Sequence, residues 1–275
     1  MISEMSFWER IVYILQRYYM SFLKGMGITF IIALVSTLIG CIIGFIIGII
    51  QTIPVNKSDN LLKRILLGIV KFILLAYVEL FRGTPMLVQA MFIFYGAASL
   101  FGINMSVMFA AFFIVSINTG AYMAETVRGG ILSIDPGQTE GAKAIGMNHV
   151  QTMMSVILPQ ALRNIMPQIG NNLIINIKDT CVLFAIGVVE LFSRGKMVAG
   201  ALYTYFESFT IVMVLYFFMT FASSRILRWW ESKLDGPDSY DLATTDTLAH
   251  TSGMITHPKV YKTGNTNLDQ NERGR

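Results

Sequence analysis

Long apolar runs separated by short polar segments dominate this chain of 275 residues. The runs extend over residues 22–53, 61–101, 105–127, 167–190 and 201–226. A helix of about 20 apolar residues crosses the hydrocarbon core of a bilayer, so each run is long enough to span a membrane. The pattern predicts an all-α integral membrane protein with about five transmembrane helices.

The run at residues 61–101 is too long for one simple span. About 40 helical residues measure about 60 Å, which is twice the thickness of the hydrocarbon core, and Gly83 and Pro85 mark a break inside the run. Two arrangements fit this length: two spans, or one span preceded by a helix near the cytoplasmic surface. We favour five spans in total, because a sixth would place one of the basic clusters outside the cell.

The two ends of the chain differ from its middle. Trp8 and Tyr18 belong to an apolar stripe at steps of three and four, which predicts an amphipathic N-terminal helix over residues 1–21. Its aromatic residues suit the headgroup layer, so we expect it to lie on the membrane surface; packing against the helical bundle is the alternative. The transmembrane domain then covers residues 22–233, and the polar residues 234–275 predict a disordered cytoplasmic tail.

Within the first run, glycines recur at every fourth position, at Gly40, Gly44 and Gly48. This spacing gives one helix face with almost no side chain, which favours close approach of a second helix. We interpret the stripe as a packing feature and not as a chemical site.

The composition agrees with a membrane protein and excludes several other classes. Hydrophobic residues make up 54% of the chain and charged residues 14%, against about 25% charged residues in soluble domains. The net charge of +4 is mild, and we assign it to cytoplasmic loops and not to nucleic-acid binding. Cys41 and Cys181 both lie inside apolar runs, so no disulfide framework is predicted. Nothing in the sequence suggests a metal site.

The distribution of Lys and Arg predicts the orientation. Cytoplasmic loops carry an excess of these residues, and most of them fall on one side when the five runs alternate across the membrane. This arrangement places the amino terminus outside, the carboxyl terminus in the cytoplasm and the polar loop of residues 135–160 in the cytoplasm.

That loop begins with a helix start. Asp135 is expected to accept a hydrogen bond from the amide of Gln138, whose side chain reaches back, while Pro136 fits the first helical position. Gly146 is placed to end the helix.

The small residues of this helix leave one flank nearly bare, and charged residues frame that flank. Another protein could therefore approach closely, although the helix could also serve merely to turn the chain around. The candidate docking residues are Glu140, Gly141, Ala142, Lys143, Ala144 and Gly146.

The motif Glu140-Gly141-Ala142, followed by Gly146 and by Ile157-Leu158-Pro159, resembles the EAA loop of ABC-importer permeases. The chain departs from that pattern at Gly141, where Ala is usual, and in ending Ile-Leu-Pro without a spacer. Four further segments resemble the branch for polar amino acids (His, Glu, Gln, Arg or opines): residues 79–85, 121–130, 159–161 and 178–180.

The resemblance implies a set of partners and a place in the cell. Such permeases pair with a second copy or a similar permease in the prokaryotic inner membrane, and each seats its loop helix, the coupling helix, on a dimer of ATPase subunits that use ATP and Mg. An extracytoplasmic solute-binding protein delivers the amino acid. The sequence contains no G-x-x-x-x-G-K-[ST] phosphate loop, so the chain is expected to be no enzyme and to bind no cofactor itself.

Charged residues inside the apolar run at 167–190 are the candidates for substrate binding, because charge at membrane depth is costly and should face the bundle interior. Lys178 would meet an α-carboxylate and Asp179 an α-amino group or the substrate's side chain, and Thr180 joins them on the strength of the resemblance. The alternative is a pair of charges that neutralise each other inside the bundle.

Two pairs of opposite charges three residues apart, Glu79 with Arg82 and Glu125 with Arg128, are expected near the cytoplasmic ends of their helices. They are either gates or structural ion pairs at helix ends. A secondary transporter driven by an ion gradient, or a channel, remains the competing function, although no internal repeat typical of such transporters is visible.

Overall fold

The computed structural model describes residues 5–55 and 60–234, and all regular structure in this part is helical. Lys57 and the predicted tail from residue 235 onward lie outside the described residues. The elements are α1 (Phe7–Thr52), α2 (Leu61–Gly83), α3 (Met86–Phe101), α4 (Val107–Leu132), α5 (Pro136–Ala144), α6 (His149–Thr152), the π-helical turn η2 (Met153–Ile157), α7 (Leu158–Asp179), the 3₁₀ turn η3 (Thr180–Ile186), α8 (Leu191–Leu202) and α9 (Tyr205–Leu234).

Membrane-spanning helices are present as predicted. Among the described residues, four helices are long and apolar enough to cross a bilayer, at Phe7–Thr52, Val107–Leu132, His149–Ile186 and Tyr205–Lys233. The 23 residues of α2 measure about 35 Å, which adds a fifth helix of sufficient length. The all-α membrane fold is therefore confirmed.

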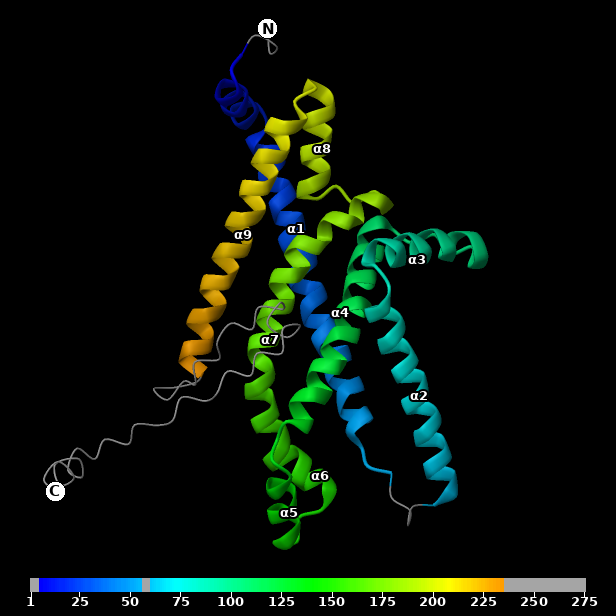
Figure 1. Cartoon of the computed structure of the whole chain (residues 1–275). Coiled ribbons are helices and arrows are strands. Elements are labelled where there is room, and N and C mark those ends of the chain that lie inside the picture. Colours follow the sequence, from blue (N-terminus) through cyan, green and yellow to red (C-terminus); the bar gives the residue numbers. More distant parts are fainter. Residues whose placement is uncertain (1–4, 56–59, 235–275) are drawn as a thin grey trace, which may run out of the picture. The chain divides into compact units, whose positions relative to one another are not determined.

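The predicted break in the run at residues 61–101 is confirmed, because α2 ends at Gly83 and α3 begins at Met86. With 16 residues, α3 measures about 24 Å and lies crosswise to α2 and α4 (Figure 1). The short helix thus follows the span, whereas we expected it to precede the span. Pro85 causes the break, since it has no N–H for the α-helical ladder and restricts the residue before it.

The glycine stripe of α1 packs against α4, as predicted, and the two helices lie side by side (Figure 1). A Cβ atom on Gly40 would lie 2.6 Å from Thr119 Cβ, and one on Gly44 would lie 2.8 Å from the Ala124 backbone nitrogen. A Cβ on Gly48 would lie 2.7 Å from a side-chain atom of Val127. Only glycine allows the two backbones to come so close.

Among the described residues, no break separates the segment from Phe7 onward from the first span, so the predicted separate surface helix over residues 1–21 is wrong. Ser6 and Glu9 form a capping box, and α1 continues without interruption to Thr52. The apolar stripe is the reason, since Ile14 and Phe22 are buried in a cluster shared with α8 and α9. The alternative, in which this segment packs against the bundle, is the one that the structure adopts.

Two features of the carboxyl-terminal half differ from the pattern of apolar runs. Pro167 does not begin a span but lies inside α7, where the helix continues through the proline while packed against α4 and α9. Residues 191–200, which separate the last two apolar runs, belong to α8. The helix forms because the Glu190 carboxylate accepts hydrogen bonds from the backbone of Phe192 and Ser193, both at 2.8 Å.

Candidate functional site

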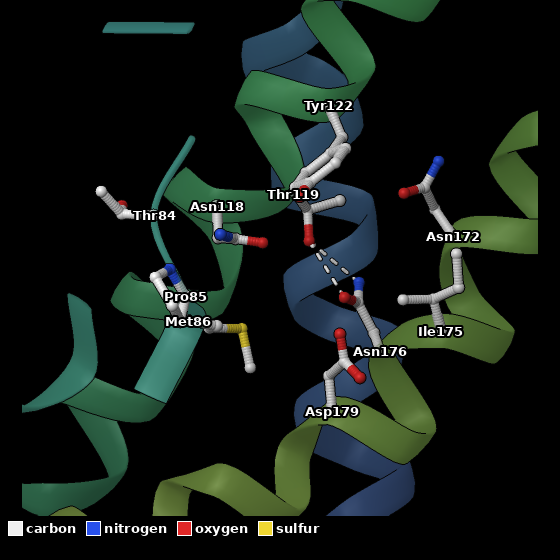
Figure 2. A pocket seen from close by; sticks show the side chains of 10 residues that line it. All are labelled: Thr84, Pro85, Met86, Asn118, Thr119, Tyr122, Asn172, Ile175, Asn176 and Asp179. Carbon is white, nitrogen blue, oxygen red and sulfur yellow. Dashed lines mark hydrogen bonds between the residues drawn. The ribbon is translucent and has the colours of Figure 1, made fainter. Parts of the chain in front are cut away.

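A cavity of about 280 Å³ opens between α4, α7 and the break that joins α2 to α3 (Figure 2). Most of its lining residues carry polar side chains, and they come from α4, from the carboxyl-terminal half of α7 and from the break. Its lining residues are Thr84, Pro85, Met86, Asn118, Thr119, Tyr122, Asn172, Ile175, Asn176 and Asp179.

Asn176 ties three helices together at this cavity. Its Nδ2 donates to Thr37 Oγ1 of α1 at 2.8 Å and to Thr119 Oγ1 of α4 at 2.9 Å, and Figure 2 shows the contact with Thr119 at the cavity wall. The side chain is 4% exposed. A buried polar group inside a membrane protein needs such partners, so this network holds the polar wall in one arrangement.

The break between α2 and α3 is stabilised by two amide side chains. A helix that ends at membrane depth leaves backbone carbonyls without partners. Gln89 Nε2 donates to the carbonyls of Phe81 at 2.8 Å and Thr84 at 2.9 Å, and Asn118 Nδ2 of α4 donates to Gln89 Oε1 at 2.9 Å. Sequence reasoning missed Gln89 and Asn118, although a polar amide soon after a proline inside an apolar run was a usable signal.

Only one of the three predicted substrate-binding residues lines the cavity. Asp179 does, and it is the only charged residue among those lining the cavity in the described part of the chain. Lys178 is exposed and is not part of the lining, and Thr180 is fully buried with its hydroxyl donating to the Ile177 carbonyl at 3.0 Å. Successive residues of a helix point about 100° apart, so Lys178 and Asp179 face different surroundings.

Of the two predicted pairs of opposite charges, one forms. Arg128 Nε donates to Glu125 Oε2 at 3.0 Å, and a second nitrogen of Arg128 donates to Oε1. Arg82 Nη1 lies 3.9 Å from Glu125, whereas no ion pair between Glu79 and Arg82 occurs among the described residues. Arg82 also lies over the ring of Tyr122 at 5.8 Å. The pairing therefore links α2 to α4.

The position of Arg82 also corrects the expectation that Glu79 and Arg82 lie near the cytoplasmic end of their helix. The end of α1, the start of α2 and α5 all lie at the same end of the bundle (Figure 1). Arg82 belongs to the last turn of α2, away from that end. The expectation was wrong because it placed the break at Gly83 on the same side of the membrane as the loop of residues 135–160.

The loop helix α5 begins and ends at the predicted residues, with one difference in its cap. The Asp135 carboxylate accepts from Gly137 N at 2.7 Å and not from Gln138, while Pro136 occupies the first turn. Gln138 does not reach back; its Oε1 lies 3.5 Å from Gln160 Nε2.

At the other end of α5, Gly146 has a φ of 86°, which an L side chain rarely adopts. Gly146 N bonds the Lys143 carbonyl at 2.9 Å and Met147 N bonds the Ala142 carbonyl at 3.0 Å. These two bonds form a Schellman motif. The predicted role of Gly146 as the end of the helix is confirmed.

Five of the six candidate docking residues are exposed, namely Glu140, Gly141, Lys143, Ala144 and Gly146. Ala142 is the exception: it is 6% exposed because it faces the protein's own interior. A Cβ atom on Gly141 would meet nothing within 4 Å, so the surface there is open.

A groove of about 320 Å³ runs beside Gly141, lined by Gly137, Gln138, Gly141, Ala142, Ile145, Met147 and Val156. Ile145, at the end of α5, is 79% exposed. Sequence reasoning did not select Ile145, although an apolar side chain at the end of a polar loop helix was a visible signal. The groove and this side chain together form an apolar surface outside the predicted membrane.

The described residues contain no group of three or more His, Cys, Asp or Glu side chains that could hold a metal ion.

Comparison with known proteins gives a consistent result. The family described as "Binding-protein-dependent transport system inner membrane component" matches residues 61–236. The glutamine transport system permease protein GlnP of Escherichia coli is 38% identical over 167 residues, which cover 60% of this chain and 76% of that protein. The probable amino-acid permease protein YxeN of Bacillus subtilis is 37% identical over 163 residues, covering 58% of this chain and 73% of that protein. Among solved structures, the crystal structure of an amino acid ABC transporter with histidines aligns with a TM-score of 0.70 and 32% identity, over 79% of this chain and 95% of the other.

Proposed function

This chain belongs to the family of binding-protein-dependent transport system inner membrane components, and we infer that it is the permease subunit of an ATP-binding-cassette importer for amino acids. Two relatives that match along most of their length are a glutamine transport system permease and a probable amino-acid permease, and one structural neighbour is an amino acid ABC transporter. The observation in the structure that carries this function is α5, a capped and exposed helix on a loop between membrane helices.

We further propose that α5 docks on an ATPase subunit, which supplies the phosphate chemistry with ATP and Mg. The open surface at Gly141 and the apolar side chain of Ile145 support close contact with a partner, and the chain has no phosphate loop of its own. On this proposal the permease is no enzyme and binds no cofactor. Its other partners are a second permease, identical or similar, and an external solute-binding protein.

The cavity is our candidate for the substrate site. Asp179 is suited to an α-ammonium group, because a carboxylate forms charge-assisted hydrogen bonds with it. The Asn172 side chain lies in the cavity wall (Figure 2) and offers its amide oxygen as a further acceptor for that ammonium group, because its Nδ2 already donates to the Gln168 carbonyl at 2.9 Å and to Met123 Sδ at 3.3 Å. This assignment replaces the earlier hypothesis for Lys178 and keeps the one for Asp179. Thr180 is not proposed as a ligand, because its hydroxyl is buried and bonded within the helix.

For the membrane, we propose a prokaryotic cytoplasmic membrane with α5 on the cytoplasmic side, the amino terminus outside and the carboxyl terminus inside. The excess of basic residues at the α5 end of the bundle supports this orientation.

The test is uptake of labelled amino acids into proteoliposomes that contain the permease, its ATPase and its binding protein. Asp179→Asn is expected to lower uptake about tenfold or more, as loss of one charge-assisted hydrogen bond implies. Lys178→Gln is the matched control and should transport at the parent rate. Uptake should require ATP and ignore an imposed proton gradient; uptake driven by an ion gradient without ATP would support a secondary transporter or channel and overturn the proposal.

A further inference from the structure

The start of α1 and the turn between α8 and α9 lie at the end of the bundle opposite to α5 (Figure 1), and their residues form an exposed aromatic cluster. We define it as Phe7, Trp8, Tyr203, Tyr205 and Phe206. The ring of Phe7 lies 5.1 Å from that of Trp8 and 5.3 Å from that of Phe206. Trp8 is 72% exposed, Tyr203 88% and Phe206 75%, which is far from the burial that large aromatic residues normally reach.

The framework under this cluster is firmly held. Arg10 Nη1 of α1 forms an ion pair with Glu207 of α9 at 2.9 Å, and Glu207 is only 6% exposed. Tyr203, at the end of α8, has a φ of 55°, a conformation that is costly for a residue with a Cβ atom. The exposed rings are therefore presented on an ordered support.

The opposite end of α9 carries a second aromatic group. Trp229 is 55% exposed and Trp230 57% exposed, and Lys233 Nζ lies 4.0 Å from the ring centroid of Trp229. From Tyr205 to Trp229 the helix advances 24 residues, or about 36 Å. This length fits a bilayer with a hydrocarbon core of about 30 Å and a total thickness of about 40–45 Å.

Between its two aromatic ends, α9 presents an apolar face. Met213 is 65% exposed, Phe217 67% and Phe218 62%, and a face of this kind suits lipid tails. Phe206 continues the exposed aromatic surface at the first turn of α9. Trp and Tyr side chains prefer the boundary between hydrocarbon and water, where the ring is shielded and the polar atom is hydrated.

We propose that the aromatic cluster is a lipid-binding anchor that lies in the headgroup layer on the side of the membrane opposite to α5. Its occupant is the bilayer itself. The spacing along α9 and the continuity with the apolar face favour lipid over a soluble protein as the occupant. This inference does not depend on which solute the permease transports.

The experiment uses the chain's own fluorescence, because it contains only three tryptophans, at positions 8, 229 and 230. The full-length double variant W229F/W230F, reconstituted into phosphatidylcholine vesicles, leaves Trp8 as the sole emitter. Lipids brominated near the glycerol end of the acyl chain should quench Trp8 at least twofold more than lipids brominated deep in the chain, and aqueous iodide should quench it weakly. W8F is the control and should report a shallow position for Trp229 and Trp230.

Two outcomes would overturn the anchor. Strong iodide quenching of Trp8 with no effect of either brominated lipid would place the cluster in water. Lipid quenching that disappears when the solute-binding protein is added would identify a soluble protein as the occupant. Size-exclusion elution at the parent volume confirms in each case that the variant is folded.

Discussion

Glu190 is the buried carboxylate at which α1, α8 and α9 meet, and its removal should destabilise the protein. The side chain is 0% exposed. It accepts hydrogen bonds from Phe192 N and Ser193 N at 2.8 Å, from the Tyr216 hydroxyl at 2.7 Å and from Thr29 Oγ1 at 3.3 Å. Glu190→Ala deletes the acceptor for all four donors at once.

The loss of stability in Glu190→Ala depends on whether the four donors can find other acceptors. The hydroxyls of Tyr216 and Thr29 can rotate toward other acceptors, whereas the backbone N–H groups of Phe192 and Ser193 are held by the helix. Each stranded donor costs about 1–3 kcal/mol, which gives about 2–6 kcal/mol for the pair. Removing the carboxylate also removes the cost of burying a charge. We therefore expect Glu190→Ala to lower the free energy of unfolding by about 3 kcal/mol. Glu190→Gln keeps one acceptor oxygen and should cost about half as much.

Thermal unfolding in detergent micelles measures this difference. At about 2–4 °C per kcal/mol for a chain of this size, Glu190→Ala should lower the Tm by roughly 6–12 °C. Glu140→Ala is the matched control, because it removes an exposed carboxylate from α5. If the two variants unfold at the same temperature as the parent protein, the carboxylate does not hold α8 in place and the reasoning is refuted.

Three further predictions follow from packing and polar contacts. Gly44→Leu should prevent accumulation of folded protein, since its Cβ would meet the α4 backbone at 2.8 Å, whereas Gly68→Leu, with nothing within 4 Å, should behave like the parent in size-exclusion chromatography. Gly141→Phe should leave the permease folded but release the ATPase in a pull-down, and retention of the ATPase with normal uptake would contradict docking through α5. Asn176→Leu should lower the Tm by several degrees through loss of its bonds to α1 and α4, at about 1 kcal/mol for each bond; an unchanged Tm would show that the network is not stabilising.

Local signals in the sequence predicted the features that depend on neighbouring residues. The glycine stripe needs only a period of four to indicate a close helix contact, and Pro85 needs only its own chemistry to end α2. The start and end of α5 likewise depend on Asp135, Pro136 and Gly146, all within one short segment. These predictions are confirmed because each one rests on residue types within a single short segment of the sequence.

The features that the sequence did not reveal depend on distant contacts. Glu190 looks like the polar end of a span, and only its position beside Thr29 and Tyr216 shows that it is buried and caps α8. Whether Ala142 faces a partner or the protein's own core is decided by how α5 packs, which periodicity does not specify. Lys178 was assigned to a ligand because of its depth, but the direction of its side chain depends on the exact rotation of α7.

One continuous helical segment connects the loop that carries α5 with the cavity. The helical segment His149–Ile186 runs without interruption from the segment next to α5 to the cavity wall, where it contributes Asn176 and Asp179. Pro159 lies at the start of α7, immediately after the π-helical turn η2, and from there to Asn176 the helix advances about 26 Å. A displacement of α5 by a bound ATPase would act on this helix at one end and reach the cavity wall at the other. The proposed ATPase contact at α5 and the cavity are therefore connected by this helix, and no further structural element is required.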